Sequence, residues 1–236
     1  MSDQMTADPA GTTTSVIRSV APVRRREGLD WAEFSRHWRE EHAVIARGLP
    51  GMTGYTQGHA IPGEQPADRP PTWAYDGVPL ASFPDLAAIG TLRAHPDYLG
   101  RAVPDEERFT DRAGMAAVLL EHCFGAAPAP VPGGRTLMVF TRVDDADEEA
   151  GRALAGALEA VPGADAALGR RWSTALDVDP GLSPRGAETR RPYDGLLEVW
   201  FPSAAPATRV AQEVASDPAL LPFEVFCLVV RENRVV

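Results

Sequence analysis

Three of the five histidines in this 236-residue chain lie in one short segment that also carries large aromatic residues. They are His37, His42 and His59. Histidine is the side chain best suited to accept and return a proton near neutral pH, and aromatic neighbours suit a flat or polycyclic substrate. The segment therefore predicts acid–base chemistry. We expect His42 to be the general base or acid, with His37 or His59 orienting the substrate or carrying a second proton.

A helix must position the first two histidines. Asp30 and Glu33 form a capping-box pattern, and glycine and proline residues follow Arg47, so the pattern predicts a helix from about Trp31 to Arg47. Residues three or four apart share one face of a helix. His42 shares its inward face with Phe34, Trp38 and Ile45.

The spacing of His37 and His42 argues against a shared metal. At roughly 100° per residue, positions five apart lie about 140° apart around the axis, so no metal ligand pair is expected. His37 and Glu41 are spaced to meet as an exposed polar pair or an orienting contact. The alternatives are that both are plain surface residues, and that His42 is a hydrogen-bonded core histidine.

Residues 52–61 read as a strand that positions the third histidine. Alternation places Tyr55, Gln57 and His59 on one surface. Burying such groups without partners costs about 1–3 kcal/mol each. This row of three side chains is therefore expected to line a cavity. The alternative is that it faces solvent or a partner subunit.

The elements of the first half follow the order β-α-β-β-α-β. This order predicts a ferredoxin-like sheet with both helices on one face, and its bare face needs a second layer. Besides the segments above, we expect strands at residues 15–23, 78–83 and 114–124, and a helical run at 84–99 that Pro96 breaks.

The second half repeats this order, so the sequence predicts an internal duplication. LPG at 49–51 recurs as VPG at 161–163, and YDG at 75–77 recurs at 193–195. We expect strands at 135–143, 161–172 (after a turn), 190–203 and 223–232, with helices at 146–160 and 204–216. No histidine lies there, although four residues could contribute to a site or a wall: Arg170, Arg171, Trp172 and Trp200.

The predicted division of the chain has four parts. Residues 1–13 form a disordered tail, 14–124 the repeat with the site, 125–134 a linker rich in proline and glycine, and 135–236 a second, degenerate repeat.

The motifs F-x-x-H-W-x-x-x-H at 34–42, LPG-x-x-x-Y-x-Q-x-H at 49–59 and YDG at 75–77 resemble the EthD-like branch of the dimeric α+β barrel superfamily. The resemblance is clear in the first half, faint in the second, and covers nearly the whole chain beyond the tail. It implies an α+β fold in which two ferredoxin-like βαββαβ units pack sheet to sheet as a barrel within one chain. The second unit lacks the histidine motif after Asp145.

Composition narrows the classes of function. A net charge of −10 argues against nucleic acid or an anionic membrane as a partner. No apolar run is long enough to span a bilayer, and no signal peptide is evident, so we expect a cytoplasmic protein. All 23 basic residues are arginine, which excludes Schiff-base lysine chemistry and weakly indicates a GC-rich bacterial genome. Cys123 and Cys227 have no metal spacing and are expected to be small buried hydrophobes.

No phosphate-binding or dinucleotide glycine motif is present, so no nucleotide cofactor has a visible binding loop. With the histidine spacing that argues against a shared metal, we expect no cofactor and no metal. The resemblance implies cyclases, dehydratases, decarboxylases and anthrone oxygenases that act without cofactors on polyketide or aromatic metabolites. A cyclase or dehydratase is our first hypothesis; a cofactor-free oxygenase and a non-catalytic metabolite-binding protein are the alternatives. The partner would be a polycyclic or polyketide small molecule, and the protein a monomeric pseudo-dimer or a homodimer. The predicted substrate-binding residues are Phe34, Trp38, Tyr55, Trp73, Tyr75 and His122.

Overall fold

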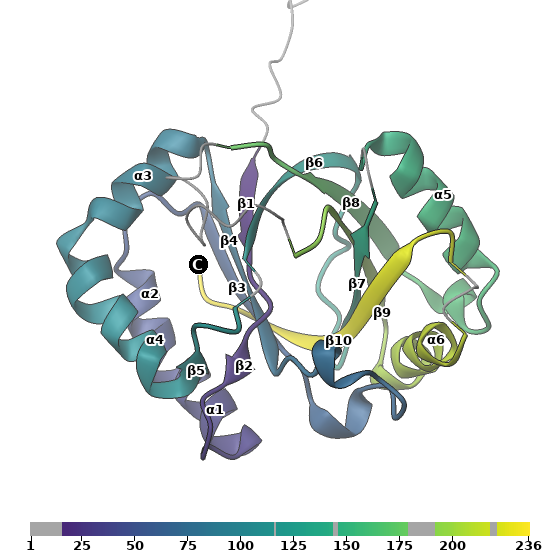
Figure 1. The fold of residues 1–236 in the computed structure, drawn as a ribbon, viewed down its shortest axis with the longest axis horizontal. Helices are drawn as coiled ribbons and strands as arrows, with labels where there is room; N and C mark the ends of the chain where they lie inside the picture. Colours follow the sequence, from purple (N-terminus) through teal and green to yellow (C-terminus); the bar gives the residue numbers. More distant parts are fainter. Residues whose placement is uncertain (1–15, 116, 144–145, 179–191, 218–220) are drawn as a thin grey trace, which may run out of the picture.

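The computed structural model describes residues 16–115, 117–143, 146–178, 192–217 and 221–236. In this part of the chain, eight strands close into an antiparallel barrel, and helices lie outside it on two opposite sides (Figure 1). The mixed α+β class expected from the sequence is confirmed. The tail predicted at residues 1–13 lies outside the described residues.

The first half supplies four barrel strands and the longer helical layer. The strands are β1 (Ile17–Val20), β3 (Gly54–His59), β4 (Gly77–Phe83) and β6 (Val118–Gly125). The helices are α1 (Trp31–His37), η1 (Trp38–His42), α2 (Ala43–Arg47), α3 (Leu86–Ala94), η4 (Tyr98–Ala102) and α4 (Val103–Phe109). Smaller elements are β2 (Arg24–Arg25), β5 (Thr110–Asp111), η2 (Pro62–Glu64) and η3 (Pro71–Trp73).

The second half supplies the other four strands. They are β7 (Arg135–Arg142), β8 (Gly169–Ala175), β9 (Gly195–Phe201) and β10 (Glu224–Arg234). Its helices are α5 (Glu148–Glu159), the short η5 (Ala164–Ala166) and α6 (Ala204–Ser216). None of the helices described in either half is long and apolar enough to cross a membrane.

The strand order explains how the barrel closes. It runs β1-β4-β3-β10-β7-β9-β8-β6, so each half contributes four adjacent strands. The halves join where β3 pairs with β10 and where β6 pairs with β8, both antiparallel. Residues 126–134 connect β6 to β7 without regular structure, close to the linker expected at 125–134. That the halves are two ferredoxin-like units related by duplication remains a prediction.

Alternation along the strands divides the hydrophobic residues between two environments. Those facing the barrel interior form one cluster, which includes Leu120, Phe140 and Leu228. Those facing outward pack beneath the helices, as Val139 and Leu197 do beneath α5 and α6. Cys227 belongs to this outer core, as expected, and burial raises the pKa of its thiol to about 12.

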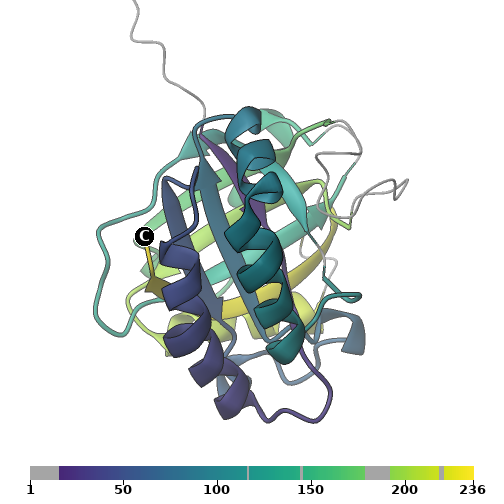
Figure 2. The same ribbon diagram turned by 90° about the vertical axis from the view of Figure 1, so that its left-hand side faces the viewer.

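The helical run of the first half is longer than the sequence indicates. The break before Pro96 is confirmed, since α3 ends at Ala94, but helical structure resumes and continues through η4 and α4 to Phe109. Pro104, which has no backbone N–H, is the second residue of α4 and comes directly after η4, where a π-helical turn replaces the regular ladder of hydrogen bonds. Figure 2 shows the resulting two helical columns side by side over the strands of this half.

The repeated YDG motif has the same packing role in both halves. A Cβ atom on Gly77 would overlap the ring of Trp38, and one on Gly195 would overlap the ring of Trp172. The glycine therefore leaves room for an indole, which a helix supplies in the first half and a strand in the second.

Candidate functional site

Two of the predicted catalytic histidines share one carboxylate. Nδ1 of His42 lies 3.0 Å from Oδ2 of Asp105, and Nε2 of His37 lies 3.0 Å from Oδ1 of the same residue. The expected pairing of His37 with Glu41 is confirmed, with Nδ1 of His37 3.2 Å from Oε2. Asp105 itself is buried.

A π-helical turn explains why His37 and His42 meet the same group. Residues 38–42 form η1, in which hydrogen bonds join residues five apart. The 140° separation expected from a regular α-helix is therefore wrong for this pair, and the histidines point to the same side. A second π-helical turn, η4, precedes α4, which carries Asp105. Such turns occur frequently at functional sites.

The surroundings of His42 favour a neutral ring with one free nitrogen. The side chain is 5% exposed, and burial lowers its pKa, although the hydrogen bond and charge of Asp105 act in the opposite direction. If Nδ1–H donates to Asp105, as the geometry indicates, the lone pair lies on Nε2. Within the described part of the chain, Nε2 of His42 makes no hydrogen bond.

Glu106 adds a second titratable group beside this network. Burial raises its pKa to about 7, although Arg112, 3.7 Å away, acts in the opposite direction. The carboxylate is close enough to raise the pKa values of Tyr55 and Tyr98, whose first cause of increase is burial. A carboxyl group with a pKa near 7 can both donate and accept a proton at neutral pH.

His59 lies on the other side of Trp38, with ring centroids 4.6 Å apart. Its Nδ1 is 3.0 Å from Oγ of Ser35, and its Nε2 is 3.4 Å from Oε1 of Gln57. Burial first, and then the nearby positive charges of Arg231 and Arg39, lower the pKa of His59 to about 4. His59 is therefore a neutral, hydrogen-bonded histidine at physiological pH.

The polar row on β3 shares one face, as the alternation predicts, and that face packs against the helices. Tyr55 accepts a hydrogen bond of 3.0 Å from Nε1 of Trp38. Gln57 donates to the Trp38 carbonyl oxygen at 2.7 Å and accepts from Asn233 at 2.9 Å. Phe34 completes the aromatic wall, 5.5 Å from Trp38 between centroids. The polar side chains of this row thus form hydrogen bonds with other groups of the protein.

Three predicted substrate-binding residues lie away from the histidines. Trp73 and Tyr75 pack on Phe226, with centroids 6.3 and 5.7 Å apart, because the turn before β4 directs them toward the barrel core. His122 is exposed near the end of β6 and bonds the Gly125 carbonyl oxygen at 2.9 Å. The structure does not bring these three residues to His42.

Sequence reasoning missed Asp105 and Glu106. They lie in α4, beyond the helical run that was expected, and Asp105 is 63 positions from His42. The sequence feature that could have predicted this helix is the acidic pair directly after Pro104, because proline followed by acidic residues is typical of a first helical turn.

Three cavities lined by described residues lie away from the histidines. Two adjoin the barrel end near residues 128–131, and one lies over α5 beside Arg152 and Arg170. Across the described ranges, no group of three or more histidine, cysteine or acidic residues is placed to hold a metal ion.

Comparisons with known proteins agree with this architecture. No curated protein matches the chain. A crystal structure of an anthrone oxidase-like protein is similar with a TM-score of 0.59, at 13% identity over 95% of this chain and 94% of that one. A candidate monooxygenase from Fusobacterium nucleatum gives a TM-score of 0.54, at 8% identity over 94% of each chain. At such identities the likeness shows the fold alone.

The family comparison concerns the part of the chain that contains the histidines. The matched segment includes α1, η1, β3 and α4, and therefore His37, His42, His59 and Asp105. Residues 26–113 match the family model of the EthD domain.

Proposed function

We propose that this protein is an enzyme that moves a proton on a polyketide-like or aromatic substrate, with His42 as the general base. The observation that carries the proposal is the buried His42 ring, whose Nδ1 is held by Asp105 while Nε2 makes no hydrogen bond in the described structure. A base oriented through one nitrogen and free at the other is the arrangement required for general base catalysis.

The proposed step begins with a proton on a carbon next to a carbonyl group. That proton passes to Nε2 of His42, and the negative charge of Asp105 stabilises the imidazolium that forms. We assign the second proton transfer to Glu106, whose pKa is about 7 and whose charge acts on Tyr55, the aromatic residue 6.4 Å from His42 between ring centroids. Return of the proton to another atom completes an isomerisation or cyclisation, and departure of a β-hydroxyl group as water gives a dehydration.

The two halves have different roles in this proposal. Residues 14–124 carry the base, and residues 135–236 complete the barrel. A single chain closes all eight strands, so barrel closure needs no second copy. The substrate-binding residues would be Phe34, Trp38 and Tyr55, on α1, η1 and β3. Of these, Tyr55 packs on His42, with ring centroids 6.4 Å apart.

A cofactor-free oxygenase is the second candidate. The same base would form a carbanion, which then reacts with O₂. The names of the two similar structures, an anthrone oxidase-like protein and a candidate monooxygenase, favour it. With anthrone the balance is one anthrone and one O₂ giving one anthraquinone and one water.

Anthrone distinguishes the two candidates and tests both. In anaerobic D₂O buffer, the proposal predicts that the protein accelerates exchange of the C10 hydrogens, followed by mass spectrometry or NMR. In air, an oxygenase consumes O₂ and forms anthraquinone, whereas a cyclase or dehydratase leaves the O₂ uptake rate at its background value. His95→Ala, a change at a half-buried histidine after α3 and outside the histidine network, is the matched control and should leave exchange unchanged. Exchange no faster than in protein-free buffer contradicts the proposal for this substrate class.

A further inference from the structure

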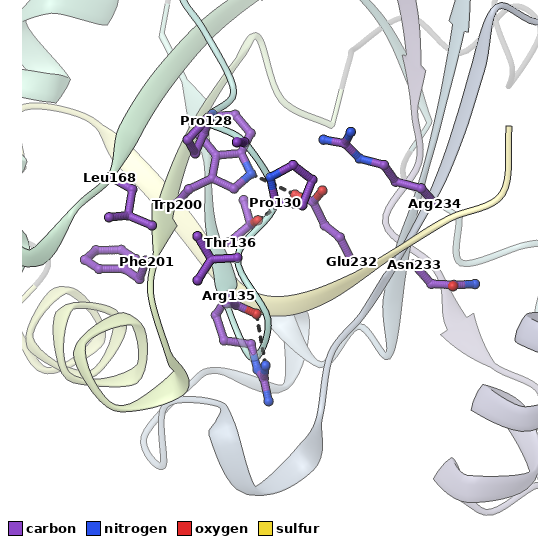
Figure 3. Close-up of a pocket in the computed structure, with 13 residues that line it drawn as sticks. Pro128, Pro130, Arg135, Thr136, Leu168, Trp200, Phe201, Glu232, Asn233 and Arg234 are labelled. Atoms are coloured by element: carbon purple, nitrogen blue, oxygen red, sulfur yellow. Dashed lines mark hydrogen bonds between the residues drawn. The ribbon is translucent and has the colours of Figure 1, made fainter.

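The interior of the barrel is polar at the end where residues 126–134 cross. Inward-facing positions of β1, β8, β9 and β10 carry charged groups there, whereas the opposite end is apolar. Two adjoining cavities, of about 310 and about 200 Å³, open on this end and share Trp200, Glu232 and Arg234. Figure 3 shows the lining of the larger one. The larger lies within the size range of pockets that hold small ligands.

A buried carboxylate joins two arginines on the floor of the smaller cavity. Glu198, 1% exposed, accepts hydrogen bonds of 2.6 and 2.9 Å from Arg18, and of 2.7 and 2.8 Å from Arg171. Burial would raise the pKa of Glu198, but the two guanidinium groups outweigh it and lower that pKa to about 2. One negative charge therefore faces two fixed positive charges.

Donors remain free around the smaller cavity, on the half-buried Arg171 and on the exposed Arg234. A guanidinium group has five N–H donors, and Arg171 gives only Nε and Nη2 to Glu198. In the described structure, Nη1 of Arg171 and the whole guanidinium group of Arg234 make no hydrogen bond or ion pair to protein groups.

Glu232, the other acidic side chain of the smaller cavity, is already held by hydrogen bonds. Glu232 accepts from Trp200 Nε1 at 2.9 Å and from Thr136 Oγ1 at 2.5 Å. Counting the side chains of the smaller cavity, three arginines (Arg18, Arg171, Arg234) face two glutamates (Glu198, Glu232). In the larger cavity, Arg135 is already paired with Glu64.

The larger cavity offers an apolar wall beside these donors. Pro128 and Pro130 of the linker line it together with Trp200 and Leu168 (Figure 3). Arg171 lies over the ring of Trp200, 5.2 Å from its centroid, which holds the indole in place. Flat apolar surface next to unpaired guanidinium donors is complementary to an aromatic ring that bears a carboxylate.

We propose that this end of the barrel is a binding site for a small aromatic carboxylate, separate from the histidine network. The ring would lie between Trp200 and the linker prolines, and the carboxylate would accept hydrogen bonds from Arg234 and from Nη1 of Arg171. This inference does not depend on the proposed function, because none of its residues belongs to the histidine network.

Calorimetric titration with 2-naphthoate tests the site, with 2-naphthamide as the uncharged probe of the same shape. The wild-type protein should bind the carboxylate at least about tenfold more tightly, because hydrogen bonds to charged groups contribute about 1.5–3 kcal/mol. Arg234→Gln should weaken binding of 2-naphthoate by about tenfold or more. Arg231→Gln is the matched control on the same strand, at an exposed position that lines neither cavity, and should change the affinity less than about twofold.

The same titration of His42→Ala separates this site from the histidine network. Unchanged affinity for 2-naphthoate supports a site at the barrel end. The proposal is overturned if the amide binds as tightly as the carboxylate, if neither probe binds, or if His42→Ala rather than Arg234→Gln removes binding.

Discussion

At the residue scale, His42 differs from His59 in what its second nitrogen contacts. Both rings are buried, but Nδ1 and Nε2 of His59 lie beside Ser35 and Gln57, whereas only Nδ1 of His42 has a partner in the described structure. A buried imidazole with hydrogen bonds at both nitrogens, as in His59, is explained by its contribution to stability alone. A ring held by a carboxylate on one side and free on the other resembles the base of a proton-transfer site.

Asp105→Asn tests whether Asp105 acts through His42 as a positioning residue. Asp105 raises the pKa of His42 against the larger effect of burial, so its loss should lower that pKa further. In anthrone exchange, the acid limb of the pH–rate profile should move to lower pH, and the plateau should fall by at least about tenfold because the ring is no longer oriented by a charge. A lower plateau with an unmoved acid limb would mean that Asp105 only supports the fold.

Glu106→Gln tests the raised pKa of Glu106 through stability. The folded pKa is about 7 against an ordinary value of 4.5, so the folded protein binds this proton more tightly than the unfolded chain does. That stabilisation is present below pH 4.5 and is lost as the pH rises through 7. Relative to the glutamine variant, the wild type should lose roughly 2 kcal/mol of unfolding free energy between about pH 5 and about pH 8. Parallel pH profiles in urea denaturation would show that the group is not buried in this way.

At the scale of secondary-structure elements, the features predicted correctly are those that follow from the spacing of hydrophobic and capping residues along the sequence. The capping box at Asp30 and Glu33, the helical segment to Arg47 and the shared face of Tyr55, Gln57 and His59 are all confirmed. The π-helical turn was not predicted, because regular α-helical spacing was assumed throughout. The extra residue in that turn makes Ala43 and Ala46 the buried positions after it, and the predicted inward residue Ile45 is only half-buried. That single turn decides whether His37 and His42 meet the same carboxylate.

Local sequence patterns could not predict the contact of His42 with Asp105 either. It joins η1 to α4 across 63 positions, and the helix that carries the carboxylate lies beyond Pro104. The candidate histidines could therefore be identified from residue type and spacing, but not the group that orients them. Tyr75, Trp73 and His122 were assigned to the site by type alone, and tertiary packing places them elsewhere.

Gly77→Ala tests the packing of the histidine helix on the sheet. A methyl group at Gly77 overlaps the ring of Trp38, so overpacking should lower the unfolding free energy by about 2–3 kcal/mol. Gly156→Ala in α5 is the control, because its methyl group meets nothing within 4 Å. That change should raise the unfolding free energy by about 0.5–1 kcal/mol. Equal effects of the two changes in chemical denaturation would mean that Trp38 does not lie on Gly77.

At the scale of the whole molecule, the barrel ties the two halves into one structure. The strand pairs β3 with β10 and β6 with β8 cross between them. So does the buried contact of Arg18, in β1, with Glu198, in β9. The second half has no histidine network, yet it supplies the inner surface that the first sheet needs in order to exclude water.

Glu198→Gln tests this connection. Removing the carboxylate leaves two guanidinium groups facing each other in a buried place, which should lower the unfolding free energy by about 3–5 kcal/mol. Arg152→Gln removes an exposed ion pair with Glu148 on α5 and should cost less than about 0.5 kcal/mol. Because Arg18 and Glu198 belong to different halves, fluorescence and circular dichroism should report one shared unfolding transition. Two separate transitions in the wild type would contradict the coupling of the halves.

The central claim is that His42 removes the proton from the substrate. The rate of anaerobic hydrogen–deuterium exchange at C10 of anthrone, compared between the wild type and His42→Ala, measures that step without any later reaction. We predict a fall of about 10²–10⁴-fold in the variant, with an unchanged circular dichroism spectrum. An exchange rate in folded His42→Ala equal to that of the wild type would contradict the assignment of His42 as the base.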